Sequence, residues 1–415
     1  MSGITTSILE RYPALGFAAY RRYWFASFAS VGATQLIVLG QGWLIFELTG
    51  STLQLGLLGA AASIPNICMT LFGGVIADRF DKRQILRTTS MLITILLLVL
   101  AWLDFSGAIE VWQVITIAAV FSLITGLDWP ARVAIYPHLI ERSAFISAVA
   151  LNSFIWQSTR MAVPALGGVL IYAADTWLIF SLSALGFFTM FVVISKIHVK
   201  LPDPTDHSPL QQLAQGILFI WHNALFKWLI ALTFSGMFLS QSYVQILPIF
   251  VDLMNMAEQG YGYLLSAGGV GSIVGTLVVG SMDEQKPIGQ YMFAGAALSV
   301  VALAGFVLAA STGWFAGALL GIFAASAFSS MYMIISMTIM QMRVPDDLRG
   351  RVMGIHTMGF SLIPLGGLFL GSMAQRTGAG PAVLYAASAY LLIVLIVWSS
   401  KSSLRRLRNQ AAQQD

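Results

Sequence analysis

The stretch Gly73-Gly74-Val75-Ile76-Ala77-Asp78-Arg79-Phe80-Asp81-Lys82-Arg83 joins two long apolar segments of the chain. It places one aspartate at the end of an apolar segment and then a short turn that contains several cations. Cationic turns between apolar segments mark the cytoplasmic side of membrane proteins. The stretch therefore predicts a membrane protein in which this turn faces the cytoplasm and forms part of a gate.

The composition agrees with this prediction. Of 415 residues, 57% are apolar and 10% are charged, and the mean hydropathy is +0.80. Soluble domains carry about 25% charged residues, so the composition excludes a water-soluble globule. The chain has a single cysteine, Cys68, which excludes an intrachain disulfide.

Long apolar stretches recur along the whole chain. A spanning helix needs about 20 apolar residues, and long apolar runs favour helices over a barrel because each helix pairs its own backbone groups. The sequence predicts an all-α integral membrane protein with twelve transmembrane helices. Their expected extents are Tyr23–Leu48, Gln54–Ala77, Ile85–Phe105, Val111–Ala134, Phe145–Tyr172, Trp177–Ile197, Ala224–Val251, Tyr261–Ser281, Gly289–Ala310, Trp314–Gln341, Val352–Ala374 and Pro381–Trp398.

The positions of lysine and arginine predict the orientation. With twelve spans, every basic residue except Arg160 and Arg376 falls on one side of the membrane. Basic residues accumulate on the cytoplasmic side, so both termini are expected in the cytoplasm of a bacterial cell, with the chain crossing the inner membrane many times. The formal charge of +4 is spread over separate segments, so it predicts topology and no nucleic-acid partner.

The chain divides near its middle into two similar halves. Pro202, Pro204 and Pro209 interrupt the longest polar stretch, and the apolar spacing from Leu210 to His222 predicts an amphipathic helix at the cytoplasmic interface. The expected organisation is a cytoplasmic segment 1–22, a six-helix half 23–200, a linker 201–223, a six-helix half 224–400 and a basic tail 401–415. Pro164-Ala165-Leu166-Gly167-Gly168 and Pro364-Leu365-Gly366-Gly367 occupy matching spans, which indicates pseudo-symmetric halves.

These motifs resemble those of the major facilitator superfamily of transporters. The opening stretch is similar to the family's Gly-x-x-x-Asp-Arg-x-Gly-Arg-Arg/Lys signature, with Asp81 in place of a glycine. The fifth span resembles the Gly-Pro-x-x-Gly-Gly motif of drug and proton antiporters, with Pro164, Gly167 and Gly168 conforming and Val163 in place of a glycine. Together with Glu47-Leu48-Thr49-Gly50-Ser51 and Pro345-x-x-Leu348-Arg349-Gly350-Arg351, they resemble the bacterial branch of enterobactin-type siderophore exporters and macrolide efflux pumps.

The resemblance implies alternating access, with a substrate site at the midplane between the halves. It also implies a cytoplasmic gate in which Asp78 faces the start of the eleventh span and Lys82 or Arg83 reaches Asp128. The expected gate residues are Gly74, Asp78, Arg79, Lys82, Arg83, Asp128, Arg349 and Arg351.

No sequence feature predicts enzymatic or cofactor chemistry. The chain has no Gly-x-x-x-x-Gly-Lys-Ser/Thr phosphate loop. Its five histidines are scattered without metal-ligand spacing. We therefore expect no cofactor, no metal and no enzymatic activity, and we expect a gradient, with protons as the coupling ion, to supply the energy.

The candidate substrate and coupling residues are polar side chains inside the spans, because buried polar groups in a membrane are costly. Arg160 lies deepest, and three roles are open for it: it attracts an anionic or electronegative substrate, it pairs with an acid and shifts as protons bind, or it locks helix packing. Glu47 is either a solvated helix end or a proton carrier, and Asp128 is either a gate partner or a proton site. The remaining candidates either line a polar cavity or form helix–helix hydrogen bonds: Gln35, Gln41, Asn152, Gln157, Gln241, Tyr243 and Gln245.

Two classes of function remain open. The first is a monomeric, lipid-embedded secondary exporter that exchanges protons for an amphipathic small molecule such as a siderophore, a drug or a secreted metabolite. The second is an uptake permease, or a transport-inactive sensor on the same scaffold. The fifth-span motif favours export, whereas the scarcity of buried acids argues against a standard proton antiporter.

Overall fold

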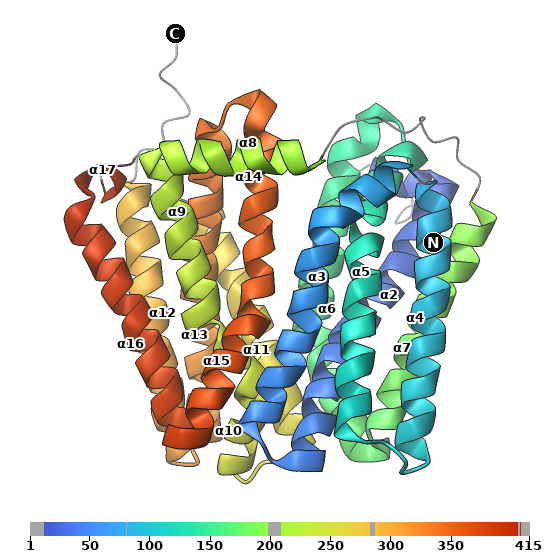
Figure 1. The fold of residues 1–415 in the computed structure, drawn as a ribbon, viewed down its shortest axis with the longest axis horizontal. Helices are drawn as coiled ribbons and strands as arrows, with labels where there is room; N and C mark the ends of the chain where they lie inside the picture. The colour runs from blue at the N-terminus through green and yellow to red at the C-terminus, as the bar shows by residue number, and fades with distance from the viewer. Residues whose placement is uncertain (1–11, 80, 198–208, 283–286, 406, 408–415) are drawn as a thin grey trace, which may run out of the picture. The chain divides into compact units, whose positions relative to one another are not determined.

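A computed structural model describes residues 12–79, 81–197, 209–282, 287–405 and 407, with the side chains of 70–79, 134, 136, 137, 209–213, 347, 402 and 403 outside the description. Every described element is helical (Figure 1). The chain forms two compact units, one built from residues 1–44 and 64–209 and the other from 45–63 and 210–415. The second unit therefore contains a segment that precedes most of the first unit in the sequence.

Unit 1 contains six long helices and three short 3₁₀ helices, and two of the long helices also reach into unit 2. The elements are η1 (Pro13–Gly16), α2 (Ala18–Thr49), α3 (Thr52–Arg79), α4 (Lys82–Phe105), α5 (Val111–Ile135), η2 (Tyr136–Leu139), η3 (Arg142–Ala144), α6 (Phe145–Ala174) and α7 (Thr176–Lys196).

The second segment of unit 2 starts with a helix, α8, that runs across the ends of α9 and α14 (Figure 1). The elements are α8 (Pro209–His222), α9 (Ala224–Ser235), η4 (Gly236–Ser240), η5 (Ser242–Ile246), α10 (Leu247–Leu253), α11 (Glu258–Gly280), α12 (Ile288–Ser311), α13 (Phe315–Arg343), α14 (Asp346–Met358), η6 (Gly359–Ser361), α15 (Leu362–Thr377), α16 (Ala379–Ser400) and α17 (Ser402–Arg405).

The helices agree with the predicted spans. Among the described residues, 11 helical segments are long and apolar enough to cross a membrane. The remaining predicted span corresponds to α6, a helix of 30 residues that is more polar because it carries Asn152, Gln157 and Arg160. The seventh and eleventh spans are interrupted: α9 continues through η4 and η5 into α10, and α14 continues through η6 into α15.

Polar side chains cap several of the helices. The Asp81 carboxylate accepts a hydrogen bond from the Arg83 backbone N–H at 2.9 Å and begins α4. The Asn223 side chain accepts from the backbone N–H of Leu225 at 3.1 Å and begins α9. Such caps satisfy N–H groups that have no partner within the helix. Asp81 therefore has a structural role at the position where the family signature has a glycine.

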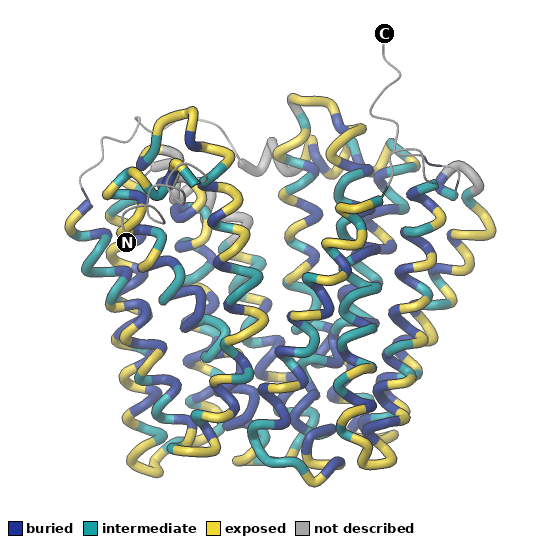
Figure 2. Tube along the Cα trace, turned by 180° about the vertical axis from the view of Figure 1, so that it is seen from behind, coloured by how far each residue is buried: buried dark blue, intermediate teal, exposed yellow. Residues whose placement is uncertain are grey.

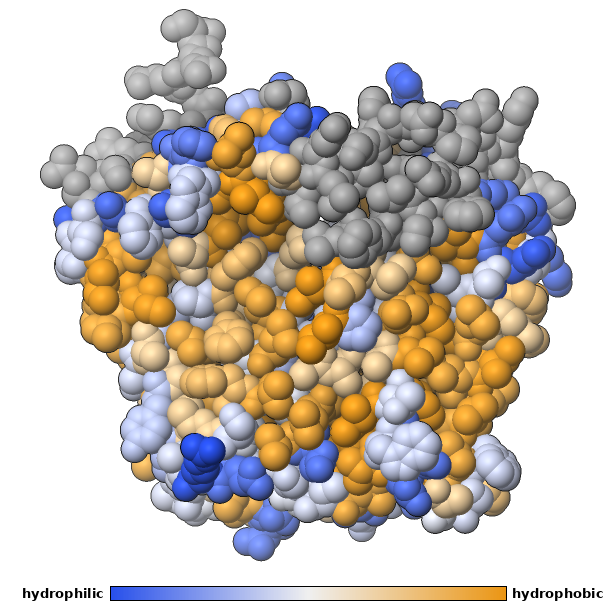
Figure 3. Space-filling model, in the orientation of Figure 1, coloured by the Kyte–Doolittle hydropathy of each residue, from blue (hydrophilic) through white to orange (hydrophobic). Residues whose placement is uncertain are grey.

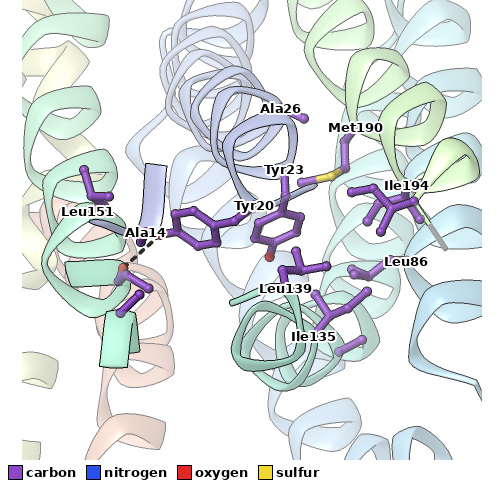
Figure 4. Packing of buried hydrophobic residues seen from close by; sticks show 14 residues of the cluster. Ala14, Tyr20, Tyr23, Ala26, Leu86, Ile135, Leu139, Leu151, Met190 and Ile194 are labelled. Atoms are coloured by element: carbon purple, nitrogen blue, oxygen red, sulfur yellow. Dashed lines mark hydrogen bonds between the residues drawn. The ribbon is translucent and has the colours of Figure 1, made fainter. Parts of the chain in front are cut away.

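The core of unit 1 is anchored by two tyrosines of α2. Tyr20 and Tyr23 are 2% and 6% exposed and pack among apolar side chains of α4, α5, α6 and α7 (Figure 4). Their hydroxyl groups donate to the carbonyls of Ala148, at 3.1 Å, and Arg132, at 3.2 Å. Burial of the rings and pairing of the hydroxyl groups together hold α2 against α5 and α6.

The surface has the character expected of membrane-spanning helices. Figure 2 shows buried and exposed residues alternating along the spans, so each helix has an inner and an outer face. Large apolar side chains such as Leu98, Leu185, Leu277 and Leu395 are exposed, and Figure 3 shows apolar residues over the middle of the helices with hydrophilic residues near their ends. Exposed apolar surface of this extent indicates contact with lipid.

Candidate functional site

A buried ion pair lies inside unit 1. Asp128 and Arg132, one turn apart on α5, are 4% and 7% exposed, and the Arg132 Nε donates to the Asp128 carboxylate. A second Arg132 nitrogen donates to the Ser30 hydroxyl at 2.8 Å, and the Thr89 hydroxyl donates to Asp128 at 2.7 Å. The pair therefore links α2, α4 and α5 in one network.

In this structure Arg83 binds another group than the one expected for the outward-open gate. Lys82 or Arg83 was expected to reach Asp128, but the Arg83 guanidinium donates to the carbonyls of Ile194, at 3.1 Å, and Ser195, at 2.7 Å. Asp128 is buried and already accepts from Arg132 and Thr89. Arg83 consequently holds the start of α4 against the last turn of α7, whose carbonyl groups accept its hydrogen bonds.

The other gate residues are only partly described. Gly74, Asp78 and Arg79 lie on α3 with side chains outside the described part of the structure, so their contacts remain predictions. Arg349 forms an exposed ion pair with Asp346 at 2.5 Å, and Arg351 donates to the Gln215 side chain on α8 at 2.5 Å. The two arginines of α14 thus bind groups of unit 2 in this structure.

In the first half, α6 presents a polar and aromatic face. Asn152, Trp156 and Arg160 follow one another at helical spacing, and the Trp156 ring packs edge-on against Trp129 of α5, with centroids 5.3 Å apart. Arg160 is exposed, and Asn152, Trp156 and Gln157 are half-buried. A charged side chain within a span normally faces the bundle interior or a water-filled route, so this face remains the predicted substrate surface of unit 1.

The predicted residues of α2 have different surroundings. Gln35 is half-buried and Glu47 is exposed near the end of the helix. Gln41 is 6% exposed, and its Nε2 has no hydrogen-bond partner among the described residues.

The antiporter-like motif of α6 packs against α2. Pro164, Gly167 and Gly168 are buried, and a Cβ atom on Gly167 would lie 2.5 Å from the Leu39 side chain. Val163, which replaces a glycine of the motif, is accommodated because it faces Gly32, where a Cβ would lie 3.7 Å from the Val163 methyl group. The motif therefore retains close packing of α6 on α2 despite the substitution.

The predicted residues of the second half do not form one polar cluster. The Gln241 amide donates to the Ser329 hydroxyl of α13 at 3.0 Å. The buried Tyr243 ring lies 5.9 Å from the Phe306 ring of α12. Gln245 packs against two glycines, because its side chain lies 3.2 Å from a Cβ built on Gly59 and 2.5 Å from one built on Gly367.

Gly59 and Gly367 belong to a helix–helix contact that the sequence did not predict. Within unit 2, the first turns of α3 run antiparallel to α15, and we call their contact the glycine seam. The Thr52 hydroxyl donates to the Gly371 carbonyl at 2.9 Å. A Cβ on Gly371 would lie 2.3 Å from the Thr52 carbonyl, one on Gly56 would lie 2.8 Å from the Gly367 carbonyl, and one on Gly59 would lie 2.7 Å from the Pro364 carbonyl. The seam is a backbone-to-backbone contact that only glycine permits at these positions.

A metal centre is not formed by the described residues, since no three His, Cys, Asp or Glu side chains are grouped to hold an ion. The site chemistry consists of one exposed guanidinium, amide groups, aromatic rings and close helix contacts. Groups of these kinds are typical of small-molecule binding surfaces.

The chain matches a family of transport proteins over most of its length. Residues 11–414 match the family described as "Transmembrane secretion effector". The chain is 25% identical over 350 residues to the Staphyloferrin A transporter of Staphylococcus aureus (strain NCTC 8325 / PS 47), covering 82% of this chain and 85% of that protein. It is 25% identical over 426 residues to the Enterobactin exporter EntS of Shigella boydii serotype 18 (strain CDC 3083-94 / BS512), covering 99% of this chain and 97% of that protein.

Solved structures support the fold. A bacterial homologue of the human lysosomal transporter Spinster, in an inward-facing conformation, aligns with a TM-score of 0.69 and 15% identity, covering 96% of this chain and 97% of that chain. A D-xylose–proton symporter aligns with a TM-score of 0.68 and 14% identity, covering 93% of this chain and 98% of that chain. At these identities the similarity concerns the fold alone.

Proposed function

Because the chain belongs to the transmembrane secretion effector family of the major facilitator superfamily, we propose that it is a secondary exporter of an amphipathic, siderophore-class small molecule, driven by proton antiport. Its family contains membrane transporters rather than enzymes. The proposal adds the direction, the substrate class and the coupling ion to that family assignment. Both termini are proposed to lie in the cytoplasm, and the transporter is proposed to act as a monomer in the lipid bilayer.

The observation that carries the proposal is the full-length match to enterobactin exporters, which covers 99% of this chain and 97% of that protein. The α6 face supports the same substrate class. A siderophore of the enterobactin type presents aromatic rings and ionisable oxygens. Arginine binds such oxygens through paired N–H groups and also stacks on rings, and the rings of Trp129 and Trp156 provide apolar surface beside it.

A complementation experiment tests the proposal. We would express the protein in an enterobactin-producing strain that lacks its own exporter and measure enterobactin in the medium and in the cells. Export raises the amount in the medium and lowers the amount in the cells. An uptake permease would have the opposite effect, and a transport-inactive sensor would change neither, so either of these results contradicts the proposal.

The glycine seam is proposed to close the outer side of the transport route, and export requires it to open and close. We expect Gly56→Ala to reduce transport about tenfold. Destabilising the closed state of the seam by about 1.4 kcal/mol would change the ratio of closed to open protein by that factor. The added Cβ would lie 2.8 Å from backbone atoms of Gly367 and Leu368, which cannot rotate away. Transport in vesicles measures the effect.

The control is Gly354→Ala, because a Cβ at Gly354 meets no atom within 4 Å. Equal transport rates in the two variants would refute the role of the seam.

Asp78 is proposed to close the cytoplasmic gate against the start of α14, where a carboxylate is favoured by the helix dipole. We expect Asp78→Asn to abolish export while leaving substrate affinity nearly unchanged, because it removes a contact specific to one conformation. In a Cys68→Ser background, labelling of Gly350→Cys from the cytoplasmic side should increase in the Asp78→Asn variant. Unchanged labelling would show that the cationic turn serves topology and not gating.

A further inference from the structure

One histidine inside the second unit is not used by the function proposed above. His356 lies on α14 and is 1% exposed, and neither of its ring nitrogens has a hydrogen-bond partner among the described residues. It lies ten residues after Asp346, at the start of α14. At about 1.5 Å per residue this places it about 15 Å along the helix from that end, inside the span Leu348–Thr377.

The helices around His356 are broken at the same level. The seventh span changes from α9 into the π-helical turn η4 and the 3₁₀ turn η5, and the eleventh span changes from α14 into the 3₁₀ turn η6. These breaks lie side by side: a Cβ on Gly359 of η6 would lie 2.7 Å from the Met237 sulfur of η4 and 2.9 Å from the Phe234 ring of α9. Gly359 follows His356 by less than one turn.

Broken helices at mid-membrane have a known physical use. Their ends direct backbone dipoles into the interior, and transporters place coupling-ion sites at such ends. Single π turns within helices also occur often at functional sites. The two breaks of unit 2 therefore form a setting in which a group that gains and loses charge can be accommodated.

The charged groups of the neighbouring elements lie toward the span ends or are already engaged. On α14, Asp346 pairs with Arg349, and Arg351 binds Gln215 of α8. His222 of α8 contacts the Leu218 carbonyl, and Lys227 of α9 lies 3.9 Å from the Trp221 ring centroid. Among the described side chains, the remaining titratable groups on the neighbouring elements are Arg343 and Tyr332 of α13, Arg376 of α15, Tyr385 and Tyr390 of α16, and Tyr243 of η5.

Tyr332 exchanges hydrogen bonds with Thr233, at 2.9 Å, and Tyr390 packs against Gly236. Both tyrosines therefore pack on α9 and its break η4. Imidazole is the one side chain among these that ordinarily gains and loses a proton near neutral pH, so His356 is the group of this set best suited to exchange a proton.

We propose that His356 carries the exchanged proton, and this rests on the proposed function of proton-coupled export. A proton from the outer aqueous side binds the lone pair of one imidazole nitrogen and gives an imidazolium. The same proton leaves to the cytoplasm after the conformational change, so the group returns to its neutral form in each cycle. In this structure His356 is buried, and its ring nitrogens have no hydrogen-bond partner among the described residues. These surroundings fit the neutral imidazole, because burying an unpaired charge is disfavoured.

Purified full-length protein in liposomes tests the proposal with iron-free enterobactin as the probe. Two assays are run on wild type, His356→Asn and His356→Gln. The first is counterflow of labelled enterobactin without a pH gradient, and the second is accumulation driven by an acid interior. A gradient of about one pH unit is a tenfold ratio of proton concentrations across the membrane. If one proton is exchanged for one enterobactin, this gradient supports about tenfold accumulation of enterobactin, because equal concentration ratios represent equal free energies.

We expect wild type to accumulate about tenfold and the two variants to show no accumulation while retaining counterflow within about twofold. The control is His222→Asn, which replaces an exposed histidine and should accumulate the probe as wild type does. Variants that accumulate normally would overturn the proposal, as would variants that lose counterflow together with accumulation, because a coupling group is not needed for exchange. A wild type without either activity would instead overturn the proposed function, and the inference with it.

Discussion

Replacing Arg132 with methionine is expected to lower the free energy of unfolding of the protein by about 3–5 kcal/mol, the usual cost of leaving one member of a buried ion pair uncompensated. Asp128 would keep the Thr89 hydrogen bond and lose the guanidinium, and Ser30 would lose its donor. The loss should appear as a large fall in the apparent Tm of the detergent-solubilised protein.

Two further variants separate this effect from a general loss of charge. Arg349→Met breaks an ion pair whose side chains are 51% and 88% exposed, and exposed pairs contribute about 0–1 kcal/mol. The double variant Asp128→Leu with Arg132→Met removes both buried charges and should recover much of the stability. A double variant as unstable as Arg132→Met alone would show that the pair is not the cause.

Replacing Arg160 with methionine is expected to abolish most transport without changing stability. A hydrogen bond to a charged group contributes about 1.5–3 kcal/mol, so apparent affinity for an anionic siderophore should fall by about 10- to 100-fold. Arg160→Lys keeps the charge without the planar fork and should lie between wild type and Arg160→Met. Transport and Tm are measured on the same preparations.

The control for this prediction is Arg376→Met, which removes an exposed arginine at the end of α15. It should transport normally. If Arg160→Met also transports normally at wild-type stability, the α6 face is not the substrate surface. If Arg160→Met loses stability, the alternative role in helix packing is correct.

The spans of this fold could be predicted from the sequence because each is a long apolar stretch, and α6 could be predicted although Arg160 makes it more polar. The breaks in the helices of the seventh and eleventh spans could not be predicted from the sequence. Residues 236–246 contain no proline and a single glycine, Gly236, so nothing local distinguishes them from a continuous helix. The π turn η4 arises where Gly236 packs directly on the Tyr390 ring, which is a tertiary contact.

The candidate site was predictable in part. Asp128 and Arg132 have the spacing of a helical ion pair, so their contact could have been predicted from the sequence. The family resemblance instead implied a contact between Asp128 and Lys82 or Arg83. The glycine seam could not be predicted, because Thr52 and Gly371 are separated by 319 positions. Pro364 and Gly367 were identified as half-repeat residues, and only the structure shows their contact with α3.

The half-repeat itself is visible in the helix contacts. In unit 1, Gly167 of α6 packs on Leu39 of α2, and in unit 2, Gly366 of α15 packs on the Phe238 carbonyl of η4. The fifth span thus contacts the first, and the eleventh contacts the seventh, through equivalent glycines. This agreement supports the prediction of two similar halves from the Pro-Ala-Leu-Gly-Gly and Pro-Leu-Gly-Gly motifs.

The most direct test of the proposed export is enterobactin uptake into inverted membrane vesicles that respiration has made acidic inside. An exporter that exchanges protons should accumulate iron-free enterobactin in these vesicles, and an agent that collapses the proton gradient should release it. Right-side-out vesicles energised in the same way should show no accumulation. Accumulation in right-side-out vesicles, or accumulation in inverted vesicles that persists without the gradient, would contradict proton-coupled export by this protein.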